Sequence, residues 1–119
     1  MNMPAFEIAQ EGTTVTVSPR ESVVTSQQMR DLIDDVTPRL EQGGASSIIF
    51  DMSHVEYLDS ACIARFISLL QQVKQANGKI ALAHCQSNVV FLVQMSRLDK
   101  LFDIVDSMDE ALERLREIG

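Results

Sequence analysis

Aromatic residues are scarce in this 119-residue chain: they make up 5% of it, and tryptophan is absent. A surface that stacks the bases of single-stranded nucleic acid needs several exposed rings, which this chain can hardly supply. Basic residues are also few, since 10 Lys and Arg stand against 17 Asp and Glu and the formal net charge is −7. That charge repels phosphate backbones and anionic lipid headgroups. We therefore expect neither nucleic acid nor a membrane surface as a partner.

Glycine and cysteine are rare as well, with five and two copies. The glycines form neither the G-x-G-x-x-G nor the G-x-x-x-x-G-K-[ST] motif, so no phosphate-binding loop for a nucleotide cofactor is expected. Cys62 and Cys85 are too few for a disulfide framework and are not a C-x-x-C pair. His54 and His84 do not have metal-ligand spacing relative to cysteines or carboxylates. We expect no cofactor and no metal.

Long apolar runs are missing too: none approaches the roughly 20 residues that a membrane-spanning helix needs. The first residues show neither the basic nor the apolar region of a secretory signal, so the cytoplasm is the expected location. Apolar residues make up 45% of the chain and charged residues 23%, which is typical of a folded globular protein. Its length predicts one domain, spanning residues 1–119.

Short β-branched or apolar runs alternate along the chain with helical periodicities. Strands are expected at residues 5–10, 13–18, 47–52, 79–83 and 101–105, and helices from Thr25 to Gly43, from Asp59 to Asn77, over 88–95 and from Ser107 to Ile118. The order β-β-α-β-α-β-α-β-α predicts a small α/β domain. Its sheet should be mixed but mainly parallel, with four or five strands and about four helices.

The helices carry further local signals. Thr25 with Gln28, and Ser107 with Glu110, have the spacing of a capping box. Pro38 lies inside the first helical pattern and should kink or restrict that helix. The expected buried face of the second helix consists of Ile63, Phe66, Ile67, Leu70 and Val73.

Asp51 ends an expected central strand, as the phosphorylated aspartate of a two-component receiver domain does. A receiver also needs an acidic pair after its first strand and a lysine after its last strand. Here Gln10-Glu11-Gly12 and Asp106-Ser107 occupy those places. We therefore interpret Asp51 as a residue that caps the turn after its strand.

Asp59-Ser60 stands at the start of the second helix. A hydrolase nucleophile is not supported, because Ser60 lacks the glycine-flanked elbow and His54 lacks an orienting third group. Simple N-capping explains the pair. Alternatively, since a helix N-terminus favours negative charge, the fold would tolerate a phosphate on Ser60 that expels a docked partner. The residues alone leave both interpretations open.

Two stretches carry a resemblance to a known family. The first stretch follows the pattern D-L-S, x-V-x-F, apolar, D-S, with Asp51-Met52-Ser53, Val55, Tyr57-Leu58 and Asp59-Ser60. The second match runs through Met95 to Phe102, Val105 to Ser107 and Glu110 to Leu112. The chain resembles the STAS domain family over nearly its whole length. Within that family it is similar to the bacterial anti-sigma factor antagonists.

The resemblance implies a binding switch rather than an enzyme. Ser60 would be the phospho-acceptor and Asp59 its neighbour. The unmodified form would bind an anti-sigma factor that is also a serine kinase with a histidine-kinase-like ATPase domain, and a PP2C-like phosphatase would restore it. The alternative is a STAS subunit of a larger assembly, either a stressosome-like scaffold or an accessory subunit of a lipid-transport ATPase.

The partner is expected to dock where the start of the second helix meets the loop from Arg20 to Val24. The predicted contact residues are Ser22, Val23, Val24, Asp59, Ser60, Ala61 and Cys62. Val23 and Val24 lie in an expected loop, so at least one of them should be exposed. The chain departs from the family pattern at Ser22, where an aspartate is usual, and at Cys62 and Arg97, where glycine is common.

Overall fold

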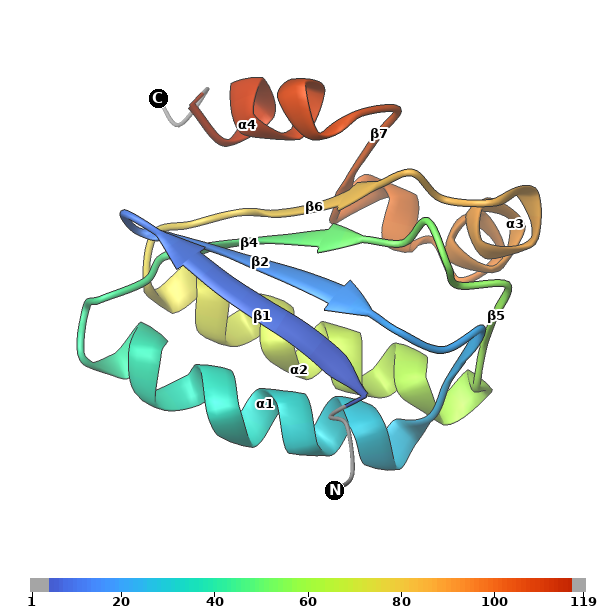
Figure 1. The fold of residues 1–119 in the computed structure, drawn as a ribbon, viewed down its shortest axis with the longest axis horizontal. Helices are drawn as coiled ribbons and strands as arrows, with labels where there is room; N and C mark the ends of the chain where they lie inside the picture. Colours follow the sequence, from blue (N-terminus) through green and yellow to red (C-terminus); the bar gives the residue numbers. More distant parts are fainter. Residues whose placement is uncertain (1–4, 117–119) are drawn as a thin grey trace.

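The computed structural model describes residues 5–116, which form a five-stranded sheet with helices on both faces (Figure 1). The strands are β1 (Phe6–Glu11), β2 (Thr14–Pro19), β4 (Ser47–Asp51), β6 (Ile80–Ala83) and β7 (Asp103–Val105), in that spatial order. Only the β1–β2 pair of this sheet is antiparallel, and the other three pairs are parallel. This arrangement confirms the predicted fold class.

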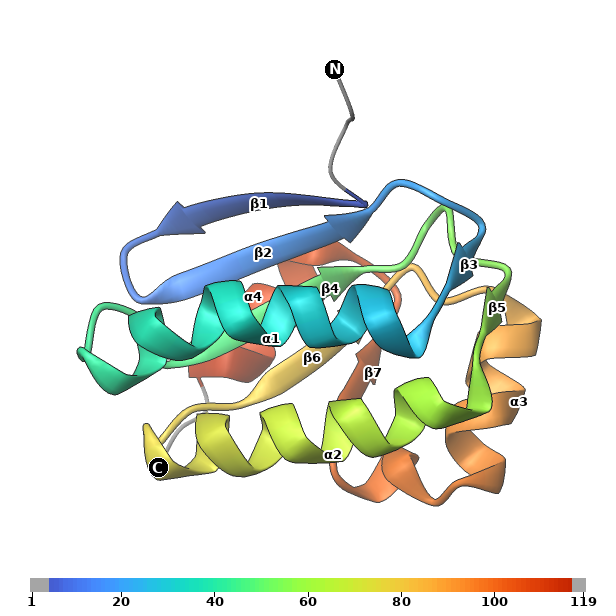
Figure 2. The same cartoon turned by 90° about the horizontal axis from the view of Figure 1, so that it is seen from below.

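The helices lie in two layers and at one end. Helices α1 (Ser26–Glu41) and α2 (Ser60–Gln75) cover one face of the sheet, and α4 (Met108–Arg116) lies on the other (Figure 2). Helix α3 (Ser87–Met95) lies beyond the carboxyl ends of β4 and β6. Ile118, predicted on the inner face of the last helix, is outside the described residues.

The core follows from the alternation of side chains along the two central strands. In β4, Ile48 and Phe50 belong to the large cluster under α1 and α2, and Ile49 belongs to the smaller cluster under α4. The Phe50 ring lies 5.0 Å from that of Phe66 on α2. Burial on both sides explains why β4 and β6 read as continuous apolar runs in the sequence.

Local signals set the start and course of α1. The Thr25 hydroxyl accepts from the Gln28 N–H at 3.2 Å, and the Gln28 side chain accepts from the Thr25 N–H at 3.0 Å, so the predicted capping box is present. Pro38 does not end the helix, which continues to Glu41. Proline lacks a backbone N–H, so one helical hydrogen bond is missing at this position. Because the position lies in the last turn of α1, the rest of the helix is unaffected.

The buried face of α2 differs from the prediction. Its buried residues are Cys62, Phe66, Leu69, Leu70 and Val73, whereas Ile67 is 38% exposed. The helix has apolar residues around more than half its circumference, so periodicity alone allowed two neighbouring faces. Packing against the sheet and α1 selected the one that contains Cys62 and Leu69.

Two short strands were not predicted. β3 (Val23–Val24) and β5 (Tyr57–Leu58) form a separate two-stranded parallel sheet in segments that we expected to be loops. The last predicted strand is also shorter, because a 3-10 helix over Leu98–Lys100 precedes it and β7 begins only at Asp103. Two-residue strands have no periodicity that a sequence pattern could reveal. Among the described helices, none has the length and apolar character required to cross a membrane.

Candidate functional site

Ser60 is the first residue of α2, and the preceding aspartate caps the helix. The Asp59 side chain accepts a hydrogen bond from the Ala61 N–H at 2.8 Å, and its carbonyl accepts one from the Cys62 N–H at 2.8 Å. Ser60 and Ala61 are both exposed. The cap therefore belongs to Asp59, and the Ser60 hydroxyl is presented to solvent on the first turn.

The β3–β5 ladder brings the predicted loop to this helix start. The Ser22 carbonyl accepts from the N–H groups of Glu56 and Tyr57 at 2.7 and 3.1 Å, and the Val24 carbonyl accepts from the Asp59 N–H at 3.0 Å. The two segments run parallel, with Val23 opposite Tyr57. The prediction that they meet at the same end of the sheet is confirmed.

The predicted contact residues differ in their exposure to solvent. Val23 is 43% exposed, but Val24 is buried beneath it, so one of the two valines is accessible, as predicted. Cys62 is buried completely. Both side chains belong to the core and are not accessible to a partner in this structure, whereas Val24 and Cys62 had been predicted as contact residues. The accessible members of the predicted set are Ser22, Val23, Ser60 and Ala61, with Asp59 partly exposed.

Tyr57 is a surface residue that sequence reasoning missed. It is 52% exposed and lies opposite Val23 in the ladder. Tyr57 precedes Ser60 by three residues, and the ladder places the exposed Val23 opposite Tyr57. The exposure of Tyr57 beside the buried Leu58 depends on the short strand β5, so the family motif alone did not show which side chain faces outward.

The start of α2 treats a buried thiol and an exposed first turn differently in electrostatic terms. Burial raises the pKa of Cys62 to about 12, and the nearby Asp59 carboxylate adds to this effect. A thiol with such a pKa stays protonated and unreactive near neutral pH. The helix N-terminus, in contrast, stabilises negative charge at its first turn.

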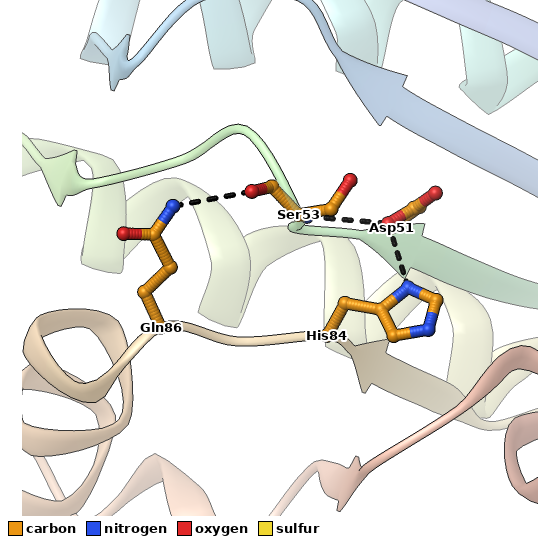
Figure 3. A network of polar contacts seen from close by, with 4 residues as sticks. All are labelled: Asp51, Ser53, His84 and Gln86. Atoms are coloured by element: carbon orange, nitrogen blue, oxygen red, sulfur yellow. Dashed lines mark hydrogen bonds and ion pairs between the residues drawn. The ribbon is translucent and has the colours of Figure 1, made fainter.

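Asp51 and the loop after it form a second polar cluster, at the carboxyl ends of β4 and β6 (Figure 3). One oxygen of Asp51 accepts from the Ser53 N–H at 3.2 Å and lies 3.1 Å from Nδ1 of His84. The predicted turn cap is confirmed, and the His84 contact is an addition that the sequence did not show. Burial raises the pKa of Asp51, but the hydrogen bonds from His84 and Ser53 outweigh it and hold that pKa below its usual value.

Gln86 contributes the second contact of this cluster, since its side-chain amide donates to the Ser53 carbonyl at 3.1 Å (Figure 3). A hollow of about 600 Å³ lies beside Asp51 and is lined in part by Arg20, Glu21 and His54. Within residues 5–116, no three His, Cys, Asp or Glu side chains are placed to hold a metal ion.

Comparison with known proteins connects this geometry to a family. The sequence model of the STAS domain family matches residues 7–111. A Thermotoga maritima protein named "Putative anti-sigma factor antagonist" is 27% identical over 73 residues, which cover 61% of this chain and 65% of that protein. The aligned part is thus slightly less than two thirds of that relative's length.

Solved structures share the fold. The crystal structure of a Thermotoga maritima protein described as a "putative anti-sigma factor antagonist" superposes with a TM-score of 0.82 at 22% identity, covering 94% of this chain and 95% of that one. The unphosphorylated form of the anti-sigma factor antagonist SpoIIAA gives 0.74 at 16% identity, with coverages of 95% and 99%. The phosphorylated form of Bacillus SpoIIAA gives 0.74 at 17% identity, with coverages of 94% and 100%. Since the family model spans most of the sequence, this chain belongs to the STAS domain family.

Proposed function

We propose that this chain is an anti-sigma factor antagonist, a regulatory binding protein without catalytic activity, switched by phosphorylation of Ser60. The observation that carries the proposal is the exposed Ser60 hydroxyl on the first turn of α2, beside the exposed pair Val23 and Tyr57. The names of its relatives and of the similar solved structures support the regulatory role.

The unmodified surface suits protein binding. Val23 and Tyr57 offer apolar area, and Ala61 is small enough for a partner's backbone to approach the helix start. Exposed apolar side chains of this size next to small residues are typical of a contact patch. Asp59 uses its carboxylate to cap α2, so it contributes to the patch mainly by holding the helix start in place.

A phosphate would change this patch without unfolding the domain. It adds roughly −1.5 to −2 charges at neutral pH. At the first turn of α2 the helix dipole compensates part of that charge, so the fold persists. In a docked complex the same group would be desolvated without a matching cation on the partner, which costs several kcal/mol. The partner is therefore released.

The chemistry of the switch defines its partners. Transfer of a phosphoryl group to a serine requires a serine kinase, and the family resemblance indicates one with a histidine-kinase-like ATPase domain that is itself the anti-sigma factor. A PP2C-like phosphatase would restore the hydroxyl. In its unmodified form, this chain would occupy the anti-sigma factor and free the sigma factor.

Phosphate mapping tests the acceptor residue. The protein is incubated with the candidate kinase and ATP and then analysed by mass spectrometry. One phosphate on Ser60 is expected, and the Ser60→Ala variant should remain unmodified. Modification at Ser22, Ser53 or Ser107 in place of Ser60 would refute the proposal, because each of these serines lies outside the first turn of α2.

A further inference from the structure

The loops that follow β4 and β6 are tied together at the carboxyl edge of the sheet. The ladder between these strands ends with Asp51 opposite Ala83, and the Met52 N–H still donates to the Ala83 carbonyl at 2.8 Å. Beyond that point the backbones no longer pair, and side chains make the connection: His84 contacts Asp51, and Gln86 contacts Ser53 (Figure 3).

His84 adopts a left-handed backbone conformation that is uncommon for residues other than glycine. Its φ is 59°, in the left-handed region, where the Cβ of any L-residue crowds the neighbouring carbonyl. Glycine would be the relaxed choice at this position. The side chain that causes the strain points its Nδ1 at the Asp51 carboxylate, so the strained residue provides a contact that glycine could not make.

Gln86 also departs from its local role. It is the N-cap residue of α3, yet its side chain makes no capping hydrogen bond to that helix. The amide instead donates to the Ser53 carbonyl in the β4–β5 loop. Two residues of the β6–α3 loop thus direct their side chains to the same short segment after β4.

That segment leads directly to the candidate switch. From Ser53 the chain continues toward β5, and the N–H groups of Glu56 and Tyr57 donate to the Ser22 carbonyl. Three residues after Tyr57 the chain reaches Ser60. The loop between Asp51 and Tyr57 is anchored at its far end by β3 and at its near end by His84 and Gln86. Met52 and Val55 are also buried, so His84 and Gln86 hold the exposed part of the loop around Ser53 and set how the chain enters β5.

We infer that His84 and Gln86 are positioning residues that clamp residues 53–56 and thereby fix the surface around Ser60 in the conformation a partner recognises. The link to recognition rests on the proposed function, whereas the clamp itself does not. A clamp of this kind raises the fraction of molecules that are ready to bind, so its loss weakens the apparent affinity of the kinase for the protein.

Amide hydrogen exchange of the isolated protein tests the clamp. In His84→Gly the contact with Asp51 is lost while the backbone strain is relieved. We expect exchange of the amides of residues 53–59 to accelerate by at least about fivefold, with an unchanged or higher thermal midpoint. Gln86→Ala should accelerate exchange in the same segment. His84→Asn should stay close to the wild type, because asparagine tolerates the left-handed region and its amide can donate to Asp51.

Arg97→Gly is the matched control. Arg97 also has a left-handed backbone, with a φ of 61°, but it lies between α3 and the 3-10 helix and makes no side-chain capping bond there. Its replacement relieves the same strain without touching the clamp. Exchange in residues 53–59 should not change. Equal exchange in His84→Gly and the wild type, or equal acceleration by Arg97→Gly, would overturn the inference.

Phosphorylation kinetics test the link to Ser60. With the kinase that modifies the wild type, His84→Gly should raise KM by about threefold or more and leave kcat unchanged, because the bound complex is the same but fewer molecules are ready to form it. His84→Asn should restore the KM. An unchanged KM alongside faster exchange would overturn the positioning role at Ser60. If the wild type is not phosphorylated, the proposed function fails, and the exchange result still decides the clamp.

Discussion

Strands β4 and β6 and the short strands β3 and β5 lie in one domain, yet different interactions hold them. β4 and β6 are buried on both faces between helices, and Ile48, Phe50 and Leu82 have no appreciable exposure. β3 and β5 consist of two residues each and are held by a few backbone hydrogen bonds, with one exposed residue in each strand. The comparison indicates that stability resides in the sheet interior, whereas the proposed binding surface lies at its carboxyl edge.

A large truncation in the sheet interior should give the largest effect on stability. Phe50→Ala removes a fully buried ring that packs against Phe66. The free energy of unfolding, measured by urea denaturation, should fall by about 3–5 kcal/mol. A loss below about 1 kcal/mol would show that the interior is not the main source of stability.

A charge at Ser60 should affect binding far more than stability. Ser60→Asp should weaken the complex with the anti-sigma factor by about a hundredfold or more, roughly 2.7 kcal/mol, because the carboxylate is desolvated in the contact. Ser60→Ala should bind like the unmodified protein. Its urea midpoint should also stay close to the wild type, since Asp59 and not Ser60 provides the cap. Equal affinity of the two variants would remove the switch.

The exposed pair Val23 and Tyr57 gives a smaller, local effect on binding. Val23→Asp should weaken the complex by about tenfold, or 1.4 kcal/mol, with little change in the urea midpoint. Glu113→Lys serves as the control, because that exposed residue lies on α4, on the opposite face of the sheet from α2. Normal binding by Val23→Asp together with loss of binding by Glu113→Lys would show that the partner docks on the α4 face and not beside Ser60.

Removal of the α1 cap should reduce stability while leaving partner binding nearly unchanged. Thr25→Ala breaks a capping box and should lower the free energy of unfolding by about 1 kcal/mol. Thr25 directly follows β3, so this variant also shows how far the β3–β5 ladder tolerates a change next to it. Partner affinity should stay within about twofold of the wild type. A larger loss of affinity would mean that binding at the carboxyl edge of the sheet depends on the stability of the helix and strands beside it.

The sequence predicted the interior of the sheet better than the short strands at its carboxyl edge. The five main strands, the four helices and the cap at Thr25 were predicted because continuous burial leaves apolar runs and periodicities. Ser60 was found from a motif. The two short strands, the exposure of Tyr57 and the burial of Cys62 were not predicted, because each depends on one or two residues in a tertiary contact. The pairing of His84 with Asp51 joins residues 33 positions apart and left no local signal.

The smallest expected effect concerns pH at the carboxyl edge. Because the pKa of Asp51 is lowered in the folded protein, its carboxylate stabilises the fold above about pH 4, and this contribution is lost as the pH falls through the lowered pKa. Asp51→Asn should therefore be slightly less stable than the wild type near neutral pH. The difference, measured by urea denaturation at several pH values, should shrink below about pH 4. A difference that is independent of pH would contradict the role of the Asp51 charge.

The most direct measurement of the central claim is calorimetric titration of the anti-sigma factor with the wild-type protein before and after phosphorylation of Ser60. The account predicts tight binding by the unmodified protein and a loss of about a hundredfold or more in affinity once a single phosphate is on Ser60. Thermal unfolding of the phosphorylated protein should match that of the unmodified protein, which excludes loss of fold as the cause. Equal affinity of the two forms would contradict the account.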